Sequence, residues 1–348
     1  MRVFRGLVLL ATFAGTVVAT DVGLVRVSER QQRFCDELAK KFRDLKNANA
    51  SVDVAPDGWL FFGPDLRLLS IGKFWGENAR EIAPMRKPDE ADPAAAIVDF
   101  SNQLKHRGIG LILVPVPPKP AIYPDRVIPG LDLNGEDPQP YLTRFYDQLR
   151  GNGVEVLDLA PIFLQRREGD RGPLFCRTDT HWSGSGCVLA AQEIAAKLKL
   201  SSEPRTDLVA DWKQIEFSGD LGSLPPADKS KPMAEKAFVR VIKDKSTGRT
   251  LQPETDSPLL LLGDSHTLVF HDFVTEGAGL LDQLAFETGV MPDLIGTRGS
   301  GATAVRVALY RRSHKDPDYL SRKKTIVWCF AAREFIEADA WARIPVSR

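Results

Sequence analysis

The chain has few histidines and cysteines, two residue types that often act in catalysis, and it has no excess of positive or negative charge. Its 348 residues include only 5 histidines and 4 cysteines, and 46 Lys and Arg balance 46 Asp and Glu. This balance gives no basic field that would recruit nucleic acid, so we expect no nucleic-acid partner. The cysteine spacing fits no zinc knuckle, and no G-x-G-x-x-G or G-x-x-x-x-G-K fingerprint follows a strand-like run. We therefore expect neither a metal nor a cofactor.

The apolar run at the N-terminus, from Gly6 to Ala19, is shorter than the about 20 residues that a membrane-spanning helix needs. Arg2 and Arg5 precede it, and small residues lie near its end, a pattern typical of a secretory signal cleaved after Ala19. We expect residues 1–19 to be a signal peptide, with an uncleaved membrane anchor as the alternative. The protein is then periplasmic or otherwise extracytoplasmic.

The 4 cysteines have two alternative fates. In an oxidising compartment they allow up to two disulfides, in three connectivities. Scattered cysteines are more commonly reduced residues of the core, and Cys187 on a predicted helix and Cys329 in a predicted strand fit that role.

Apolar patterns alternate between strand and helix from about residue 91 onwards. The predicted strands are IGLILVPVPPK, VEVLDLA, LLLLGDSH, QLAFETG and KTIVWCFAAREF. Helical patterns lie between them, including one near residues 269–274 and one in ATAVRVALYRRS. Such alternation predicts an α/β fold with a mostly parallel sheet and helices on both faces. Residues 201–257 break the rhythm, and we interpret them as an insertion with a hairpin around Ser246 to Gly248, within one domain spanning residues 20–348.

A buried strand leads directly into the motif GDSHT. Leu259 to Leu262 form a short apolar run bounded by Pro258 and Gly263, which is typical of a strand buried on both faces. Ligands of open α/β sheets bind at the carboxyl ends of such strands. Ser265 is therefore a candidate nucleophile, although Gly-Asp-Ser is also ordinary turn chemistry.

His181 has the best surroundings for a general base that would activate a serine. In RTDTHWSGSG, Asp179 comes two residues before it and Trp182 follows, where an indole ring could shield the imidazole from water. A base of this kind needs a third group to fix its tautomer, and Asp179 can supply it. The alternative is a structural role, with Asp179 capping the following helix and His181 packed in the core.

Other residues compete for, or could complete, such a site. A metal centre is an alternative, because the sequence offers suitable ligands, namely Asp179, His181, Asp264, His266, His271 and Asp272. We favour a role for His266 near a helix N-terminus and a surface position for His271. The glycine-rich loop GTRGSGA precedes a helix, and amides at Gly299 or Gly301 could stabilise an oxyanion. Arg298 in this loop and Trp182 are further substrate-site candidates, although the loop also fits a plain helix start.

Several blocks, in this order, resemble the alginate O-acetyltransferase proteins of the AlgJ and AlgX type. These blocks are DGWLF, LVPVPPK with YPD, VEVLDL, TDTHW, GDL, LLLLGDSH, RGSGA and VWCFAAREF. The combination of TDTHW with a later GDS is the specific part. The sequence ends soon after VWCFAAREF, so we expect no C-terminal carbohydrate-binding module, and His266 replaces a bulky aromatic residue common at that position.

The resemblance implies a three-layer α/β/α sandwich of the SGNH-hydrolase type with a circularly permuted motif order. It implies that Asp179, His181 and Ser265 form a catalytic triad for acetyl transfer to a polysaccharide, with a membrane-bound acyltransferase partner supplying the acetyl group. Two rivals stay open. One is an acetylesterase or deacetylase with the same triad, and the other is a non-catalytic polysaccharide-binding subunit of an export complex.

Overall fold

The computed structural model describes residues 26–83, 87–198, 205–226 and 233–347. The predicted signal peptide, residues 1–19, lies outside the described residues. Among the helices of the described ranges, none combines the length and the apolar character that crossing a membrane requires.

A five-stranded sheet forms the centre of the protein, and every pair of neighbouring strands in it is parallel. The strand order is β10-β9-β11-β3-β4. The strands are β3 (Gly110–Val116), β4 (Glu155–Val156), β9 (Leu259–Gly263), β10 (Asp293–Gly296) and β11 (Thr325–Ala331). Every residue of β9 is buried, because its leucines pack against helices on both faces of the sheet. The predicted parallel sheet is thereby confirmed.

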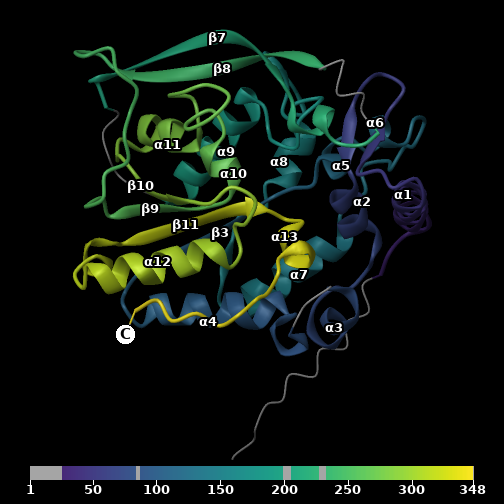
Figure 1. Ribbon diagram of the computed structural model, residues 1–348, viewed down its shortest axis with the longest axis horizontal. Coiled ribbons are helices and arrows are strands. Elements are labelled where there is room, and N and C mark those ends of the chain that lie inside the picture. Colours follow the sequence, from purple (N-terminus) through teal and green to yellow (C-terminus); the bar gives the residue numbers. More distant parts are fainter. Residues whose placement is uncertain (1–25, 84–86, 199–204, 227–232, 348) are drawn as a thin grey trace, which may run out of the picture.

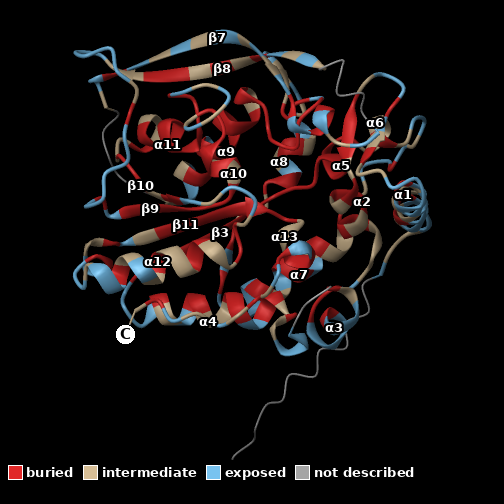
Figure 2. Ribbon diagram, in the orientation of Figure 1, coloured by how far each residue is buried: buried red, intermediate tan, exposed pale blue. Residues whose placement is uncertain are grey.

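Helices cover both faces of this sheet, as Figure 1 shows. Helices α4 (Pro93–Lys105) and α12 (Ala304–Lys315) lie on one side, and α9 (Gly184–Leu198) and α11 (Leu280–Thr288) lie on the other. Figure 2 shows buried residues along the strands and on the helix faces turned toward them. This is the three-layer α/β/α sandwich expected from the sequence.

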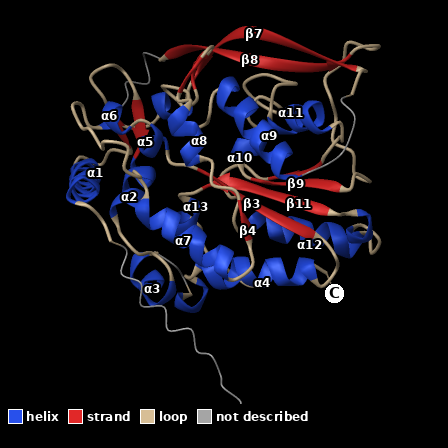
Figure 3. Cartoon of the chain, turned by 180° about the vertical axis from the view of Figure 1, so that it is seen from behind, coloured by secondary structure: helices blue, strands red, loops and turns tan. Residues whose placement is uncertain are grey.

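The N-terminal elements lie beyond the carboxyl ends of the central strands, next to α13 (Glu334–Glu337) (Figures 1 and 3). In the first of these elements, a helix, Phe34 and Leu38 lie four residues apart on one face and are fully buried. The elements of this region are α1 (Glu29–Asn47), β1 (Val52–Val54), β2 (Leu60–Phe62) and α2 (Gly63–Ser70). Shorter or peripheral elements are α3 (Ala79–Ile82), α5 (Lys119–Ile122), α6 (Pro124–Val127), α7 (Pro140–Gly151), α8 (Ala160–Gln165), β5 (Glu168–Gly169) and β6 (Gly172–Pro173).

The stretch predicted to be an insertion forms a long ribbon outside the central sheet. Strand β7 (Leu208–Ser218) pairs antiparallel with β8 (Ala234–Asp244) along its whole length, and the ribbon lies over α9 and α11 (Figure 1). The hairpin predicted around Ser246 to Gly248 is wrong in its pairing. A turn is present there, but the main partner of β8 is β7, and the segment after the turn contributes only the bridge from Lys243 to Thr250.

Two further element predictions are wrong. QLAFETG belongs to helix α11 and not to a strand, and this helix is buried around most of its circumference, since all residues from Leu280 to Ala285 are buried. The helix expected near residues 269–274 is also absent: α10 (Ser265–Leu268) ends before it, and Phe270 and Val274 adopt left-handed backbone angles that interrupt a helix.

All 4 cysteines are free and buried in the described structure. Burial raises the pKa of the Cys35 thiol to about 11 and the pKa values of Cys176, Cys187 and Cys329 further still. The second of the two alternatives, reduced core residues, describes them.

Candidate active site

Ser265 lies at the carboxyl end of β9, where it begins the short helix α10. Asp264 caps this helix: its Oδ1 accepts a hydrogen bond from the amide of His266 at 2.8 Å, and its Oδ2 accepts one from the amide of Ala331 at 2.8 Å. The second bond ties the turn to β11, the neighbouring strand. The serine is therefore held at a fixed point above the sheet edge, and its side chain is only partly buried.

His181 and Asp179 meet Ser265 in one chain of hydrogen bonds. His181 Nε2 is 2.8 Å from Ser265 Oγ, and His181 Nδ1 is 2.6 Å from Asp179 Oδ1. In the neutral tautomer that these contacts favour, Nδ1–H donates to the carboxylate and Nε2 accepts the serine proton. Two segments that are far apart in the sequence thus bring a serine, a histidine and an aspartate into the geometry of a catalytic triad.

The charges along this chain of hydrogen bonds stabilise the protonated imidazole of His181. Burial alone lowers the pKa of His181, but the hydrogen bond and negative charge of Asp179 outweigh burial and raise that pKa above its ordinary value. Burial likewise raises the pKa of Asp179, yet its bonds to His181 bring it well below the usual range. Asp179 therefore stays ionised when His181 takes a proton, as a general base requires.

A buried lysine holds the loop that carries Asp179. Lys119 is 1% exposed, and its ammonium group donates hydrogen bonds to main-chain carbonyl oxygens of this loop, those of Cys176 at 2.9 Å, Arg177 at 3.3 Å and Asp179 at 2.7 Å. Burial lowers the pKa of Lys119, while the charge of Asp179 opposes this shift. Lys119 belongs to the LVPVPPK block, and we infer that it positions the loop and takes no direct part in chemistry.

Strand β8 and the segment that follows β7 also hold this loop. Glu235 of β8 accepts hydrogen bonds from the amides of Arg177 and Thr178 at 2.6 and 2.8 Å. Asp220 begins a short 3-10 helix after β7, Asp220–Ser223. Its amide donates a hydrogen bond to Asp179 Oδ2 at 2.9 Å, and its carboxylate accepts one from the amide of Thr180 at 2.7 Å. The stretch that we interpret as an insertion thus completes the surroundings of the triad acid.

The triad opens into a pocket of about 520 Å³. The lining residues come from many segments and are Phe62, Pro64, Thr180, His181, Asp220, Leu224, Asp264, Ser265, Phe273, Arg298, Gly299, Arg333, Glu334 and Glu337. Trp182 does not line it. The indole is fully buried and stands edge-on to His266. The rings beside His181 are His266 and Phe273, with centroids 4.7 and 5.7 Å from that of His181.

The glycine-rich loop, residues 296–302, contributes unequally to the pocket. Gly299 lines it with a left-handed backbone (φ 77°), and the space beside its Cα, where a side chain would begin, is open. Gly301 lies deeper, against Asp264 and Phe330, and its amide lies by the Glu334 carboxyl, whose pKa it helps to lower. Arg298 stands at the rim, over the Phe273 ring at 4.4 Å.

Sequence reasoning did not single out one cation and one acid that line this pocket, Arg333 and Glu334. Arg333 and Glu334 follow β11, the strand beside β9, so the rule that directed attention to Ser265 applies to them as well. Arg333 Nη1 lies 3.4 Å from Asp65 Oδ1, and its guanidinium covers the ring of Phe62. Both residues line the pocket.

The residues considered for a metal do not converge as one set. Among the described residues, Asp179, His181 and Asp220 offer ligand atoms within 4.8 Å of one another, but hydrogen bonds inside the site already engage these atoms. His266 is fully buried near the N-terminus of α10, as favoured, and burial lowers its pKa. His271 is not a surface residue: it is largely buried and bonds to Asp282 at 2.9 Å.

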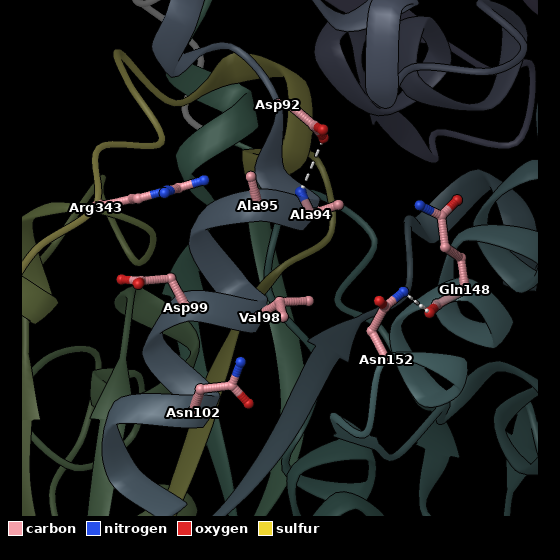
Figure 4. A pocket seen from close by; sticks show the side chains of 9 residues that line it. All are labelled: Asp92, Ala94, Ala95, Val98, Asp99, Asn102, Gln148, Asn152 and Arg343. Atoms are coloured by element: carbon pink, nitrogen blue, oxygen red, sulfur yellow. Dashed lines mark hydrogen bonds between the residues drawn. The ribbon is translucent and has the colours of Figure 1, made fainter. Parts of the chain in front are cut away.

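A second hollow, of about 380 Å³, lies along α4 and contains no triad residue (Figure 4). Its lining is Asp92, Ala94, Ala95, Val98, Asp99, Asn102, Gln148, Asn152 and Arg343. Figure 4 shows that the short acids and amides spread around it and converge on no single point. The chemistry that the fold brings together is therefore in the first pocket.

Comparison with known protein families shows which family this chain belongs to. The SGNH hydrolase-like domain of the acetyltransferase AlgX matches residues 52–280, a range that contains Asp179, His181 and Ser265. The chain belongs to this family.

Relatives and solved structures agree with this assignment. A probable alginate O-acetylase AlgJ of Pseudomonas syringae pv. tomato is 25% identical over 242 residues, covering 66% of this chain and 57% of the relative. One of Pseudomonas aeruginosa is 26% identical over 181 residues, covering 51% and 41%. The chain thus spans about half the length of these curated relatives.

The fold of this family member matches two solved structures. The O-acetyltransferase domain of Pseudomonas putida AlgJ superposes with a TM-score of 0.61 at 20% identity, covering 82% of this chain and 92% of that one. Pseudomonas aeruginosa AlgX gives 0.54 at 15% identity, covering 82% and 66%. These likenesses concern the fold.

Proposed function

We propose that this protein is a serine-dependent O-acetyltransferase that acetylates hydroxyl groups of a polysaccharide. The observation that carries the proposal is the unbroken chain of hydrogen bonds from Asp179 through His181 to Ser265, at the mouth of a pocket. Membership of the AlgX acetyltransferase family supports the reaction type, and the relatives named alginate O-acetylase support a polysaccharide acceptor.

The first half-reaction acetylates Ser265. Ser265 Oγ attacks the carbonyl carbon of an acetyl donor while His181 Nε2 takes the hydroxyl proton. The tetrahedral intermediate collapses, the bond from carbon to the leaving group breaks, and His181 returns the proton to that group. Asp179 holds the imidazole in the required tautomer and stabilises its charged form.

The second half-reaction transfers the acetyl group from Ser265 to the acceptor. An acceptor hydroxyl gives its proton to His181, its oxygen bonds to the acetyl carbon, and the ester bond to Ser265 Oγ breaks as the serine regains the proton. Each step places negative charge on the acetyl oxygen. Ser265 and Gly299 line the pocket, and their amides are our candidates for stabilising this charge.

The sequence supports a proposal for the compartment and for the acetyl donor. The secretory pattern of residues 1–19 supports export to the periplasm or another extracytoplasmic space. A free coenzyme thioester is not supplied there, so we propose that a membrane-bound acyltransferase partner delivers the acetyl group to Ser265, directly or through a carrier.

A transfer assay tests the proposal. Purified protein receives a chromogenic acetyl ester together with oligouronates and neutral oligosaccharides, and mass spectrometry follows the sugars. We expect acetylated oligosaccharide with the wild type, because a transferase site positions an acceptor well enough to compete with water. The Ser265→Ala variant serves as the background control.

Hydrolysis of the ester without acetylation of any oligosaccharide would favour the acetylesterase alternative. Absence of both reactions, in a protein that is folded by circular dichroism, would favour a non-catalytic polysaccharide-binding subunit.

A further inference from the structure

One acidic side chain in the pocket has no role in the triad. Glu334 begins α13, directly after β11, and β11 pairs with β9 so that Cys329 stands opposite Gly263. The residues that follow the two strands therefore meet at the same edge of the sheet. Glu334 and Ser265 accordingly line one pocket.

The carboxyl group of Glu334 has unused hydrogen-bonding capacity. A carboxylate offers about four acceptor positions, and the amides of Ala302 and Gly301 that lie beside this group can fill at most two of them. Its Oε2 is buried and has no hydrogen-bond partner among the residues that the structure describes. The neighbouring Glu337 differs, because its carboxylate is taken by Arg67 at 2.7 Å. A buried acceptor without a partner is costly, and such groups in folded proteins commonly bind a ligand or serve chemistry.

The chemistry of the two half-reactions indicates what that ligand is. A carboxylate accepts hydrogen bonds, and an acetyl group has no N–H or O–H to donate, so the acetyl group itself cannot satisfy Glu334. A polysaccharide acceptor carries many hydroxyl donors. We propose that the carboxyl group of Glu334 binds a hydroxyl group of the acceptor sugar and so orients the sugar for attack on acetylated Ser265.

This proposal rests on the proposed function. In it, Glu334 determines how often acetylated Ser265 reacts with a sugar hydroxyl and how often it reacts with water. Water and sugar both lose their proton to His181, so the triad promotes both reactions. A group that orients only the larger acceptor changes the ratio of transfer to hydrolysis. That ratio is therefore the quantity to measure.

The electrostatic surroundings give the ratio a pH dependence. Burial and the charge of Asp264 raise the pKa of Glu334 to about 7, against the opposing effects of Arg333 and the amides of Ala302 and Gly301. Above this pH the carboxylate is ionised and is the stronger acceptor, and below it the group is neutral. The other charged or titratable groups around the pocket are Asp65, His181, Asp220, Asp264, Arg298, Arg333 and Glu337.

The experiment compares Glu334→Gln with the wild type, using a chromogenic acetate as donor and the oligouronates and neutral oligosaccharides as acceptors. Released chromophore gives total turnover, and acetylated sugar gives transfer. We expect the wild-type ratio of transfer to hydrolysis to rise as pH increases through about 7. In Glu334→Gln we expect this ratio to fall by about ten- to a hundredfold, the value of a hydrogen bond to a charged group, and to lose its pH dependence.

Glu155→Gln is the control, since it makes the same change at a carboxylate that already has a partner, Lys197 at 2.9 Å, and that does not line the pocket. Its ratio should stay at the wild-type value. Because the ratio is taken within one sample, partial unfolding of a variant lowers both products together and leaves it unchanged.

Two results would overturn the inference, and they are distinguishable. If the wild type acetylates sugar and Glu334→Gln has an equal or higher ratio at every pH, Glu334 does not orient the acceptor and the transferase proposal survives. If the wild type acetylates no sugar, the proposed function fails and this inference fails with it.

Discussion

Replacing Ser265 with alanine is expected to lower turnover of a small chromogenic acetate by about 10⁴- to 10⁶-fold, because members of a triad act as a unit. Removal of Oγ leaves His181 without the proton that it is placed to accept at 2.8 Å. The side chain is only partly buried and its hydroxyl bonds to His181, so we expect thermal stability close to that of the wild type.

Steady-state kinetics of the purified variant measures this effect, and circular dichroism checks the fold. Ser321→Ala is a suitable control, since its hydroxyl bonds to the Asp318 carbonyl, away from the pocket. Retention of more than about a tenth of wild-type turnover by Ser265→Ala, a barrier change of only about 1.4 kcal/mol, would show that Ser265 is not the nucleophile.

Asp179→Asn is expected to lower the same turnover by about 10⁴-fold while keeping the shape of the site. Asparagine removes the negative charge that raises the pKa of His181, and its amide favours the tautomer that carries the proton on Nε2. An imidazole in that tautomer cannot accept the serine proton. A fall in kcat with little change in KM is the expected kinetic signature.

Asp220→Asn separates orientation of the base from general support of the loop. Asp220 Oδ2 is 3.9 Å from His181 Nδ1, against 2.6 Å for Asp179 Oδ1, and Asp220 supports Asp179 through its own main-chain amide. Asparagine retains that amide, so we expect a much smaller loss than for Asp179→Asn. A larger loss in Asp220→Asn would move the role of triad acid to Asp220.

Inner strands of the sheet could be predicted from their apolar runs, because a strand that is buried on both faces has apolar residues at successive positions. Leu259 to Leu262 and the stretch around Cys329 have no polar alternation, and both form inner strands of the parallel sheet. A short apolar segment with mixed neighbours carries less information. QLAFETG fits either period, and its helical form depends on packing between α11 and α9, which the sequence does not display.

The triad residues could be proposed because each lies in a short local motif. The contacts that hold the triad residues in place could not be predicted, because these contacts involve main-chain groups that the fold brings together from distant segments. The Asp220 amide reaches Asp179 across 41 positions, and Lys119 reaches the same loop across about 60. Gly-Asp-Leu and Pro-Pro-Lys carry no local sign of such bonds.

Glu334 was predictable in principle from the rule already applied to Ser265. The sequence VWCFAAREF was interpreted only as a strand, although the polar residues that follow a buried strand mark the ligand edge of an α/β sheet. What sequence could not supply is the strand order that places β11 beside β9.

The central claim is that acetyl passes through Ser265, and peptide mapping of the protein quenched during turnover of an acetyl ester tests it most directly. We predict one added acetyl group on the peptide that contains Ser265, no such adduct in Ser265→Ala, and faster loss of the adduct when oligosaccharide acceptor is present. Steady turnover of the ester by the wild type with no acetyl on Ser265, or with the adduct on another residue, would contradict the account.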